Sequence, residues 1–317
     1  MAEPGSCVAG ALCEEPWLIA RGADGVLRAF ANVCRHHAAE LLAPGAHCVD
    51  ELVCPYHGWT YGLDGGLQSA PGMGAMQDFA RADFGLRPLA VTTWGPLLFL
   101  SWDPAPPPLL AGLAELDREL EADGWGALRH AASRRYEMDC NWKVFADNYL
   151  DGGYHIAHLH PGLDGQLDMG DYRTELAGPG HSVQRCASAG ERAAFHGRDF
   201  AGRIGAGACY AWIHPNLAIN RYGPILDTNR LLPTGPESCE VVFDFWFPAD
   251  ADAHFVAASL EASEEVQRQD QGICASVQRG LRSRAYDRGR YAPSSEAAAL
   301  HFHRRLAADL RAAMAGA

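Results

Sequence analysis

Short apolar runs separated by turn residues dominate the first third of the chain. They include WLIARG, DGVLRAF, ELVCPYHGWTYGLDGGL and TTWGPLLFLSW. Runs of this length, with aromatic and branched residues and with glycine, proline or aspartate at their ends, are typical of β-strands. Asp24-Gly25 and Asp64-Gly65 stand between such runs, and this dipeptide favours a hairpin turn. The pattern predicts a small, mostly β domain over residues 1–105.

A proline-rich segment, DPAPPPLLAGL at Asp103–Leu113, follows this domain. Its three consecutive prolines, Pro106–Pro108, favour a stiff extended link. In the second domain, residues 106–317, the spacing of apolar residues predicts helices at about 142–150, 252–286 and 295–314, and strand-like runs at 209–222 and 239–248. This combination favours an α+β fold, in which helices cover an antiparallel sheet.

The longest predicted helix carries a stripe of residues spaced three or four apart, which we expect to face the core. The stripe consists of Val266, Asp270, Ile273, Val277 and Leu281. A buried carboxylate costs several kcal/mol unless it is paired or binds a metal. Asp270 is therefore expected to be a metal ligand or, alternatively, the partner of an arginine such as Arg268. Glu264, Glu265 and Gln269 lie off the stripe and are expected in solvent.

Composition and charge exclude several classes of protein. With 48% apolar and 21% charged residues, the chain is neither disordered nor fibrous. The net charge of −13 argues against nucleic-acid binding. No apolar run reaches the roughly 18–20 residues of a membrane helix, and the start, MAEPGSCVAGALCEEPW, resembles no signal or transit peptide. We therefore expect a cytoplasmic protein without a membrane partner, whose ten cysteines serve metals rather than disulfides.

Two Cys-His pairs suggest a first metal site. Cys34-Arg35-His36 and Cys54-Pro55-Tyr56-His57 each combine one thiolate with one imidazole, in loops between predicted strands. Zinc fingers usually place both cysteines in one pair, whereas mixed pairs suit a 2Fe-2S cluster with two cysteines on one iron and two histidines on the other. We expect this cluster at Cys34, His36, Cys54 and His57; structural zinc and simple core packing are the alternatives. His37 and Cys48 lie outside the spacing.

The segment NWKVFADNYLDGGYHIAHLH, residues 141–160, suggests a second metal site. His155 and His160 together with one carboxylate would hold iron(II) and leave positions open for oxygen and substrate. Asp270 is the expected carboxylate, and Asp164 and Asp168 are the alternatives. His158 is expected to be a neighbour rather than a ligand, and the alternative for both histidines is core packing.

These motifs together resemble the α subunits of Rieske non-haem iron oxygenases. Matching stretches run from Asn32 nearly to the C-terminus and include CPYHGWTYGLDG, NLAINRYGPILDTN, VQRGLRSRAYDRGRYAP and HFHRRL. DNYLDGGYH, INRYGP and the tail resemble a narrower branch, the choline monooxygenases and other enzymes of quaternary ammonium compounds. The resemblance implies a Rieske 2Fe-2S domain, a catalytic domain of the helix-grip type and a mononuclear non-haem iron(II).

The resemblance also implies a reaction and partners. Choline is oxidised to betaine aldehyde hydrate, the first step of glycine betaine synthesis, with O₂ and electrons from a ferredoxin or a flavin/iron-sulfur reductase. Family members form homotrimers, in which an acidic residue bridges the cluster of one subunit to the iron of the next. That residue often lies three positions before the first iron histidine, but Gly152 stands there in this chain. Asp151 is therefore the expected bridge, and Asp147 the alternative.

The substrate is less well defined by the sequence. A trimethylammonium group donates no hydrogen bonds, so aromatic faces are its natural receptor. The predicted strands offer Tyr210, Trp212, Tyr222, Phe243, Phe245 and Trp246, of which alternation turns about half away from any pocket. Three alternatives stay open: demethylation of glycine betaine or a related compound, hydroxylation of an aromatic ring, and a Rieske electron carrier or redox sensor without oxygenase activity.

Overall fold

The computed structural model describes residues 1, 3–190, 194–195, 198–199 and 201–316. The chain divides into two compact units, Met1–Leu109 and Leu110–Ala317. The division falls in the proline-rich segment, after residue 109 rather than after residue 105. Within the described part of the chain, no helix is both long enough and apolar enough to cross a bilayer.

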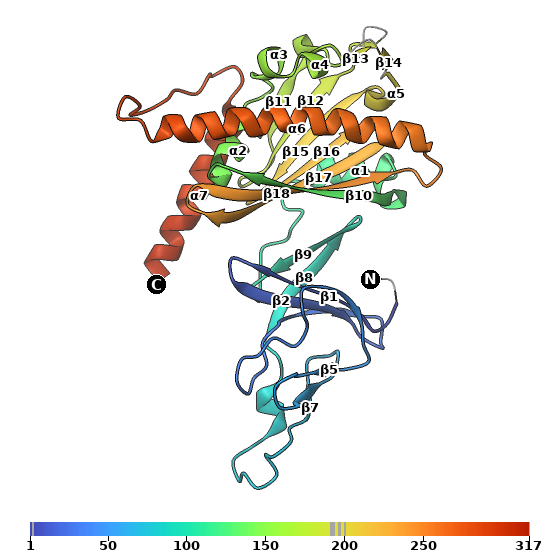
Figure 1. Ribbon diagram of the computed structural model, residues 1–317, viewed down its shortest axis with the longest axis vertical. Coiled ribbons are helices and arrows are strands. Elements are labelled where there is room, and N and C mark those ends of the chain that lie inside the picture. Colours follow the sequence, from blue (N-terminus) through green and yellow to red (C-terminus); the bar gives the residue numbers. More distant parts are fainter. Residues whose placement is uncertain (2, 191–193, 196–197, 200, 317) are drawn as a thin grey trace. The chain divides into compact units, whose positions relative to one another are not determined.

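The first unit is mostly β-structure (Figure 1). Its strands are β1 (Ser6–Leu12), β2 (Glu15–Arg21), β3 (Leu27–Ala31), β4 (Gly45–Cys48), β5 (Leu52–Val53), β6 (Thr60–Tyr61), β7 (Leu67–Ser69), β8 (Pro88–Trp94) and β9 (Leu97–Ser101). They form one sheet in the order β4-β1-β2-β3-β8-β9 and a smaller one in the order β5-β6-β7. A short 3₁₀ helix, η1 (Arg81–Phe84), precedes β8.

Both predicted hairpin turns of the first unit are confirmed. Gly25 lies between the paired strands β2 and β3, and Gly65 between β6 and β7, with φ of +75° and +85°. Gly65 has a second reason to be glycine, because a Cβ there would lie 2.4 Å from the Phe30 ring. The core of this unit includes Leu18, Leu52 and Trp59. Cys34 and Cys54 of the two Cys-His loops belong to the same core.

The second unit is built around one antiparallel sheet with the order β10-β18-β17-β16-β15-β12-β11. The strands are β10 (Arg129–Met138), β11 (Arg173–Leu176), β12 (Ser182–Ala187), β15 (Gly207–Ile213), β16 (Leu217–Tyr222), β17 (Ile225–Gly235) and β18 (Ser238–Phe247). A separate pair consists of β13 (Ala194–Phe195) and β14 (Arg198–Asp199). The sheet with its helices confirms the predicted α+β class.

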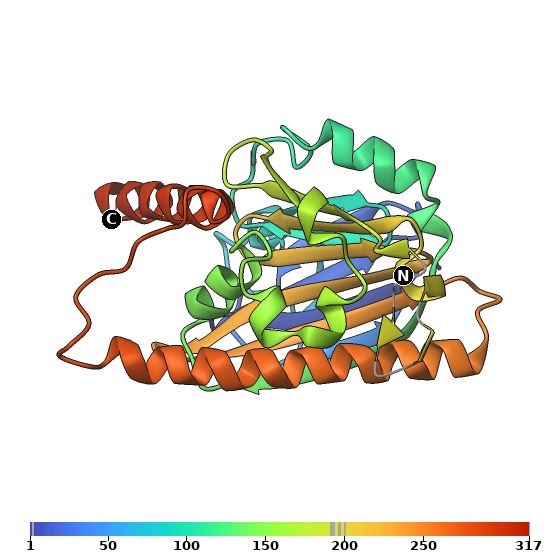
Figure 2. The same ribbon diagram turned by 90° about the horizontal axis from the view of Figure 1, so that it is seen from above.

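The helices of this unit are α1 (Ala114–Ala122), α2 (Trp142–Tyr149), α3 (Ile156–Leu159), α4 (Pro161–Asp164), α5 (Ala201–Ile204), α6 (Ala253–Leu281) and α7 (Ala297–Gly316). Two 3₁₀ helices, η2 (Trp125–Ala127) and η3 (Met169–Asp171), complete the unit. The predicted run 209–222 is two strands, β15 and β16, joined by a turn at residues 214–216. In Figures 1 and 2, α6 runs lengthwise over the sheet.

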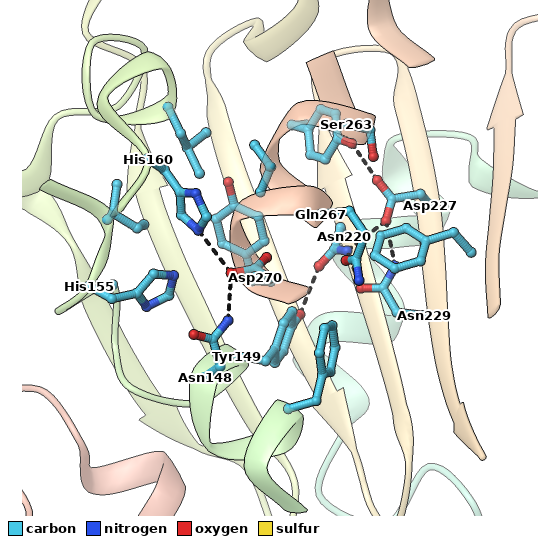
Figure 3. A pocket seen from close by; sticks show the side chains of 18 of the residues that line it. Asn148, Tyr149, His155, His160, Asn220, Asp227, Asn229, Ser263, Gln267 and Asp270 are labelled. Atoms are coloured by element: carbon cyan, nitrogen blue, oxygen red, sulfur yellow. Dashed lines mark hydrogen bonds and ion pairs between the residues drawn. The ribbon is translucent and has the colours of Figure 1, made fainter. Parts of the chain in front are cut away.

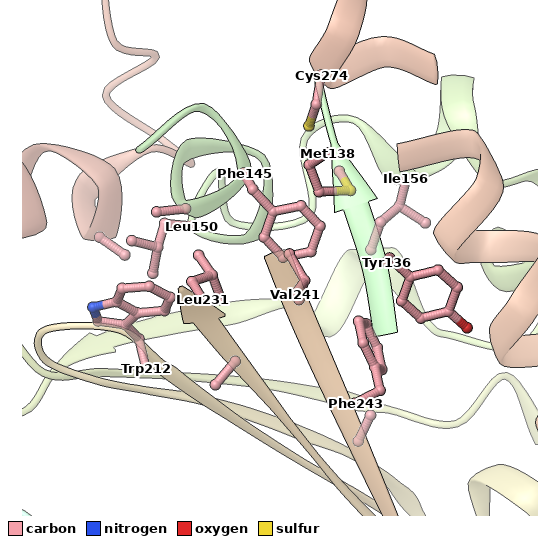
Figure 4. Close-up of a cluster of buried hydrophobic side chains, with 14 of the residues drawn as sticks. Tyr136, Met138, Phe145, Leu150, Ile156, Trp212, Leu231, Val241, Phe243 and Cys274 are labelled. Atoms are coloured by element: carbon pink, nitrogen blue, oxygen red, sulfur yellow. The ribbon is translucent and has the colours of Figure 1, made fainter. Parts of the chain in front are cut away.

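A large apolar core lies between the sheet and its helices (Figure 4). Phe145 and Leu150 of the α2 region pack against Trp212, Leu231 and Val241 on the strands, and these side chains are 8% exposed or less. Burial of side chains this large stabilises the unit by roughly 1.5–3 kcal/mol each. This packing fixes α2, and with it the segment that carries the histidines of the predicted iron site.

The predicted core stripe of α6 is wrong, although Asp270 is buried. Ile273, Val277 and Leu281 are 40%, 43% and 45% exposed. The buried side chains of α6 are Ser259, Ala262, Ser263, Gln267, Asp270, Cys274 and Gln278. This face has the same three- and four-residue steps as the predicted stripe but is mainly polar. Its larger polar members, Gln267, Asp270 and Gln278, have hydrogen-bond partners, whereas the Ser259 hydroxyl has none among the described residues. Gln278, for example, accepts a hydrogen bond from the backbone N–H of Asn141 at 2.9 Å.

Candidate metal sites and substrate pocket

The two Cys-His loops of the first unit have the same local construction. In each, the N–H of the residue four places after the cysteine donates to the cysteine carbonyl: Ala38 to Cys34 at 3.0 Å, and Gly58 to Cys54 at 3.0 Å. Both of those residues have positive φ, +62° and +69°. The tight loops bury both cysteines and turn the histidine that follows each one toward the other loop. The rings of His36 and His57 are 4.7 Å apart.

One observation at these loops fits a bound metal, and a second fits a 2Fe-2S cluster better than one zinc ion. Nδ1 of His36 is buried and has no hydrogen-bond partner among the described residues, as expected for a nitrogen that ligates a metal. No three of the four side chains bring their donor atoms within 4.8 Å of one another. The donors of a tetrahedral zinc ion lie about 3–4 Å apart, whereas a cluster distributes four donors over two irons.

Neighbouring side chains orient this site. The hydroxyl of Tyr61 lies 3.4 Å from Sγ of Cys34 and accepts a hydrogen bond from the backbone N–H of Arg35 at 3.0 Å. The His36 ring stacks on Trp59 with 4.7 Å between ring centroids. Cys48 is exposed on β4. His37 is exposed, and its ring lies 4.0 Å from that of His36.

A second group of donors lies in the other unit (Figure 3). Among the described residues, the only three donors whose ligand atoms all lie within 4.8 Å of one another are His155, His160 and Asp270. We call these three residues the donor group. Gly152 and Gly153, with φ of +72° and +75°, turn the chain after α2 so that the four-residue helix α3 follows. His155 and His160 flank this helix, and their rings are 5.0 Å apart.

Each member of the donor group is held by a neighbour. Nδ1 of His155 bonds Oδ2 of Asp151 at 2.6 Å, and Nδ1 of His160 bonds Oε1 of Gln269 at 2.6 Å. Nδ2 of Asn148 donates to Oδ1 of Asp270 at 2.7 Å. The Nε2 atom of each ring is thereby left for a metal, which is the usual arrangement of ligating histidines.

The electrostatics of the donor group favour a cation. Burial alone lowers the pKa of His160, but the hydrogen bond to Asp270 and the charge of that carboxylate raise the pKa overall. Nε2 of His160 lies 3.1 Å from Oδ1 of Asp270, and both side chains are nearly buried. Two imidazoles and one carboxylate with this spacing fit iron(II), and the open side of the group faces a cavity.

The structure corrects two expectations around the donor group and does not support one alternative. Gln269, expected in solvent, bonds His160. Glu264 is also engaged rather than free, because Arg134 and Tyr136 both donate to it. Arg268 lies 3.4 Å from Glu264 and has no contact with Asp270. His158 is exposed and lies outside the donor group, as do Asp164 and Asp168.

The residues before His155 explain where an acidic bridge can stand. A side chain at position 152 is excluded, because its φ is +72° and a Cβ there would lie 2.3 Å from the carbonyl oxygen of Ser295. Asp151 accepts from the backbone N–H groups of Tyr154 and His155, at 3.1 and 3.0 Å, in addition to the His155 ring. Asp147 instead contacts His303 of α7, at 2.6 Å. Of the two candidates, Asp151 is the one in contact with His155.

The open side of the donor group forms part of a pocket of about 130 Å³ within the second unit. Its aromatic walls are Phe145, Tyr149, Tyr172, Tyr210, Tyr222 and Phe243. Three of the six aromatic candidates from the sequence are thus in the pocket. Trp212 and Phe245 are buried in the core, and Trp246 points to the opposite face of the sheet, beside His130. A pocket of this size admits a small molecule rather than a drug-sized one.

Comparison with known protein families decides the assignment. The family described as "Ring hydroxylating alpha subunit (catalytic domain)" matches residues 125–312, and the family described as "Rieske [2Fe-2S] domain" matches residues 1–80. The chain belongs to the Rieske non-haem iron oxygenases. This Rieske oxygenase therefore has a 2Fe-2S cluster domain and a catalytic domain for non-haem iron, as its resemblance to the family implied.

Several known proteins are similar to this Rieske oxygenase over most of its length. It is 42% identical to a choline monooxygenase of Arabidopsis thaliana, over 93% of this chain and 71% of that protein. It is 35% identical to a choline monooxygenase of Beta vulgaris, over 93% of this chain and 66% of that protein. The solved structure of a quaternary ammonium Rieske monooxygenase is 25% identical and has a TM-score of 0.83, over 98% of this chain and 86% of that chain.

Sequence reasoning missed most of the polar pocket. Asn148, which holds Asp270, and Tyr149 in the walls lie within DNYLDGGYH but were not expected at the site, and Gln269 and Tyr172 lie in no motif. Other lining residues, Asn220, Tyr222, Asp227 and Asn229, lie in NLAINRYGPILDTN, which the resemblance had singled out. Tyr222 was among the aromatic candidates from the sequence. For the other three residues the motif was present, but the pairing of two strands was needed to show that they share one face.

Proposed function

We propose that this Rieske oxygenase oxidises choline to betaine aldehyde hydrate. The observation that carries the proposal is the pocket: the donor group opens into a cavity of about 130 Å³ with aromatic walls. The balanced reaction takes choline, O₂, two electrons and two protons to betaine aldehyde hydrate and water. Bound iron would supply the oxygen-activating chemistry, and the cluster would supply the electrons.

The chain's own residues have three tasks in this reaction. His155, His160 and Asp270 would hold the iron, while Asp151, Gln269 and Asn148 orient them. Cys34, His36, Cys54 and His57 would hold the cluster. The aromatic walls exclude water and surround the trimethylammonium group, for which ring faces are favourable neighbours. Both similar plant proteins are named as choline monooxygenases, which supports this choice of substrate.

The proposal includes partners and an assembly. A ferredoxin or a flavin/iron-sulfur reductase would deliver the electrons. A homotrimer would bring the cluster of one subunit to the iron of the next, with Asp151 as the bridge and Asp147 as the second candidate. The description of the similar solved structure refers to inter-subunit electron transfer in that enzyme, which supports this arrangement. A cytoplasmic location stays a prediction, and the plant relatives are named as chloroplastic.

One observation favours a second candidate substrate. The guanidinium of Arg203 lines the same pocket, and its Nε atom is buried without a hydrogen-bond partner among the described residues. A guanidinium suits a carboxylate, so an ammonium compound that also carries a carboxylate, such as carnitine or glycine betaine, is the alternative. The description of the similar solved structure concerns carnitine oxidation.

A turnover assay decides between these substrates. The protein, reconstituted without oxygen with iron and its cluster, is supplied with a ferredoxin and its reductase and given choline, glycine betaine or carnitine. We expect betaine aldehyde from choline, at a kcat/KM at least about tenfold above that for the other two compounds. A faster reaction with carnitine or glycine betaine, with a demethylated or cleaved product, would replace choline in the proposal.

A further inference from the structure

A buried carboxylate lies in the pocket opposite the donor group. Asp227 is on β17, is 2% exposed and lines the cavity. Figure 3 shows it on the far side of Asp270 from His155 and His160. Ile225, Asn229 and Leu231 lie at two-residue steps from it, on the same face of β17. Ile225 and Leu231 belong to the core. The backbone register therefore places this charge inside the unit, so that its burial does not depend on a flexible side chain.

The partners of Asp227 are neutral. Asn220 donates to Oδ1 at 2.6 Å, Asn229 donates to Oδ1 at 3.1 Å, and the hydroxyl of Tyr222 donates to Oδ2. No described lysine, arginine or histidine forms an ion pair with Asp227 within 4.0 Å. The closest cation in this network, Arg203, lies over the Tyr222 ring at 4.7 Å and donates to the Tyr222 hydroxyl at 3.3 Å. Arg203 therefore reaches the carboxylate only through that hydroxyl.

Such a carboxylate is costly unless something compensates its charge. Burial is the largest influence and raises the pKa of Asp227 overall, although the three hydrogen bonds and the charge of Arg203 act in the opposite direction. The amide and hydroxyl donors hold the group in place, but they leave a negative charge beside a small cavity with aromatic walls. A cation that enters the cavity supplies a counter-charge without an intervening group, whereas Arg203 acts only through the Tyr222 hydroxyl. The surrounding aromatic rings add favourable contacts to the same cation.

We propose that Asp227 is the anchor that binds the cationic head of the substrate. The proposal rests on the proposed function and deepens it, because it assigns the head and the tail of the molecule to opposite ends of the pocket. A head held at Asp227 directs the hydroxyl-bearing carbon toward His155, His160 and Asp270. Asp227 is thus a residue that determines specificity for ammonium compounds over neutral alcohols of the same shape.

The test compares choline with 3,3-dimethylbutan-1-ol, in which a carbon atom replaces the charged nitrogen. Asp227→Asn keeps the size of the side chain and removes its charge. We expect the KM for choline to rise at least about 30-fold, as for the loss of one partner of a buried charge pair, while kcat changes little. The KM for the neutral alcohol should stay the same or fall. The preference for choline over the alcohol should therefore collapse in the variant.

A matched control removes the same charge from the other face of the sheet. Asp244 lies on β18, where it contacts Ser133 and Arg230, outside the pocket. Asp244→Asn should keep the wild-type preference for choline. If Asp227→Asn does not fold, as judged by circular dichroism and iron content, Asp227→Glu and Asp227→Gln replace it, since they differ from each other mainly in charge. Retention of the preference by the uncharged variant would overturn the proposal.

Binding of tetramethylammonium separates this proposal from the proposed function. Calorimetry of the reconstituted protein, with potassium chloride as the reference salt, should show binding to the wild type and at least about 30-fold weaker binding to Asp227→Asn. If the enzyme does not oxidise choline but binds tetramethylammonium in this Asp227-dependent way, the choice of choline fails and the anchor stands. If the wild type does not bind the ion, the anchor is refuted even when choline is oxidised.

Discussion

At the scale of single residues, Asp270 is held by Asn148 and lies against the His160 ring. Asn148 donates to Oδ1 at 2.7 Å from α2, and the His160 ring approaches the same oxygen at 3.1 Å. Asp151 and Gln269, which are not members of the donor group, orient the histidine rings by hydrogen bonds to Nδ1. Partners of this kind fix the orientation of a ligand before the metal arrives.

Replacement of Asn148 by alanine should weaken iron binding without affecting the cluster. The variant loses the donor that orients Asp270, and partners of metal ligands typically contribute about 10–100-fold to metal affinity. We expect iron(II) affinity, measured anaerobically against a competing chelator, to fall by about that factor. The visible spectrum of the cluster should stay unchanged, because the cluster loops belong to the other unit.

Lys143→Ala serves as the control on the same helix, since the Lys143 amine lies over the Trp142 ring, away from the donor group. This control should bind iron like the wild type. An Asn148→Ala variant with unchanged iron affinity would show that the hydrogen bond does not orient Asp270.

At the scale of elements, α7 is attached to the second unit by several histidine contacts. Nε2 of His214 bonds Asp309 at 2.7 Å, and Nε2 of His303 bonds Asp147 at 2.6 Å. His301 contacts the backbone at Gly180. His181 is buried beside them, and its Nδ1 accepts from the backbone N–H of His214 at 3.1 Å. This part of α7 should therefore respond to protonation.

The histidine contacts predict a loss of stability in acid. Burial, with the nearby His214, Arg305 and His301, lowers the pKa of His181 to about 4, and burial also lowers the pKa of His214. The unfolded chain, with a histidine pKa of about 6.5, then binds more protons than the folded one. The contribution of His181, roughly 2–3 kcal/mol, is present above pH 6.5 and is lost as the pH falls toward 4. Urea unfolding at a series of pH values measures it.

His181→Asn tests the origin of this loss, because its amide oxygen can still accept a hydrogen bond but does not titrate. Between pH 6.5 and 4 the unfolding free energy of the variant should fall less steeply than that of the wild type. His254→Asn, at the exposed start of α6, should keep the wild-type slope. Equal slopes in His181→Asn and the wild type would assign the acid sensitivity to other groups.

At the scale of the whole molecule, the proposed cluster and iron sites lie in different compact units of one chain. An electron must therefore pass between units, either within a subunit or across the interface of an oligomer. The proposed homotrimer is a closed ring with a heterologous interface, which is the symmetry that lets each cluster serve the next subunit.

Mixed oligomers distinguish the two routes. A His57→Ala chain should lose the cluster and keep the iron, and an Asp270→Ala chain should lose the iron and keep the cluster. Neither chain should turn over alone, with iron contents of about one and two per chain, against about three in the wild type. If electrons cross between subunits, oligomers reassembled from both chains should recover a substantial part of the activity. Activity that stays absent in verified mixed oligomers would place electron transfer within one subunit.

The amino-acid sequence by itself determined the metal chemistry and the fold class. Cys34, His36, Cys54 and His57, and likewise His155 and His160, stand a few residues apart in the chain, so local turns are enough to bring the members of each pair together. The ligand types are also chemically restrictive, because mixed Cys-His pairs have few uses other than a Rieske cluster. Hairpins and helices were predictable from the turn residues and the apolar spacing, because these patterns also depend only on residues close together in the chain.

Only the tertiary structure decided which side of α6 is inside and what the pocket contains. Two faces of α6 have the same period. The buried polar face is tolerated because Asn141, Met138 and His160 supply partners to it from distant parts of the chain. The burial of the Asp227 carboxylate has the same explanation, since it depends on the register of β16 and β17. Hydrogen-bond partners brought together from far apart in the chain determine the stability of a buried polar group, and a linear pattern does not contain that information.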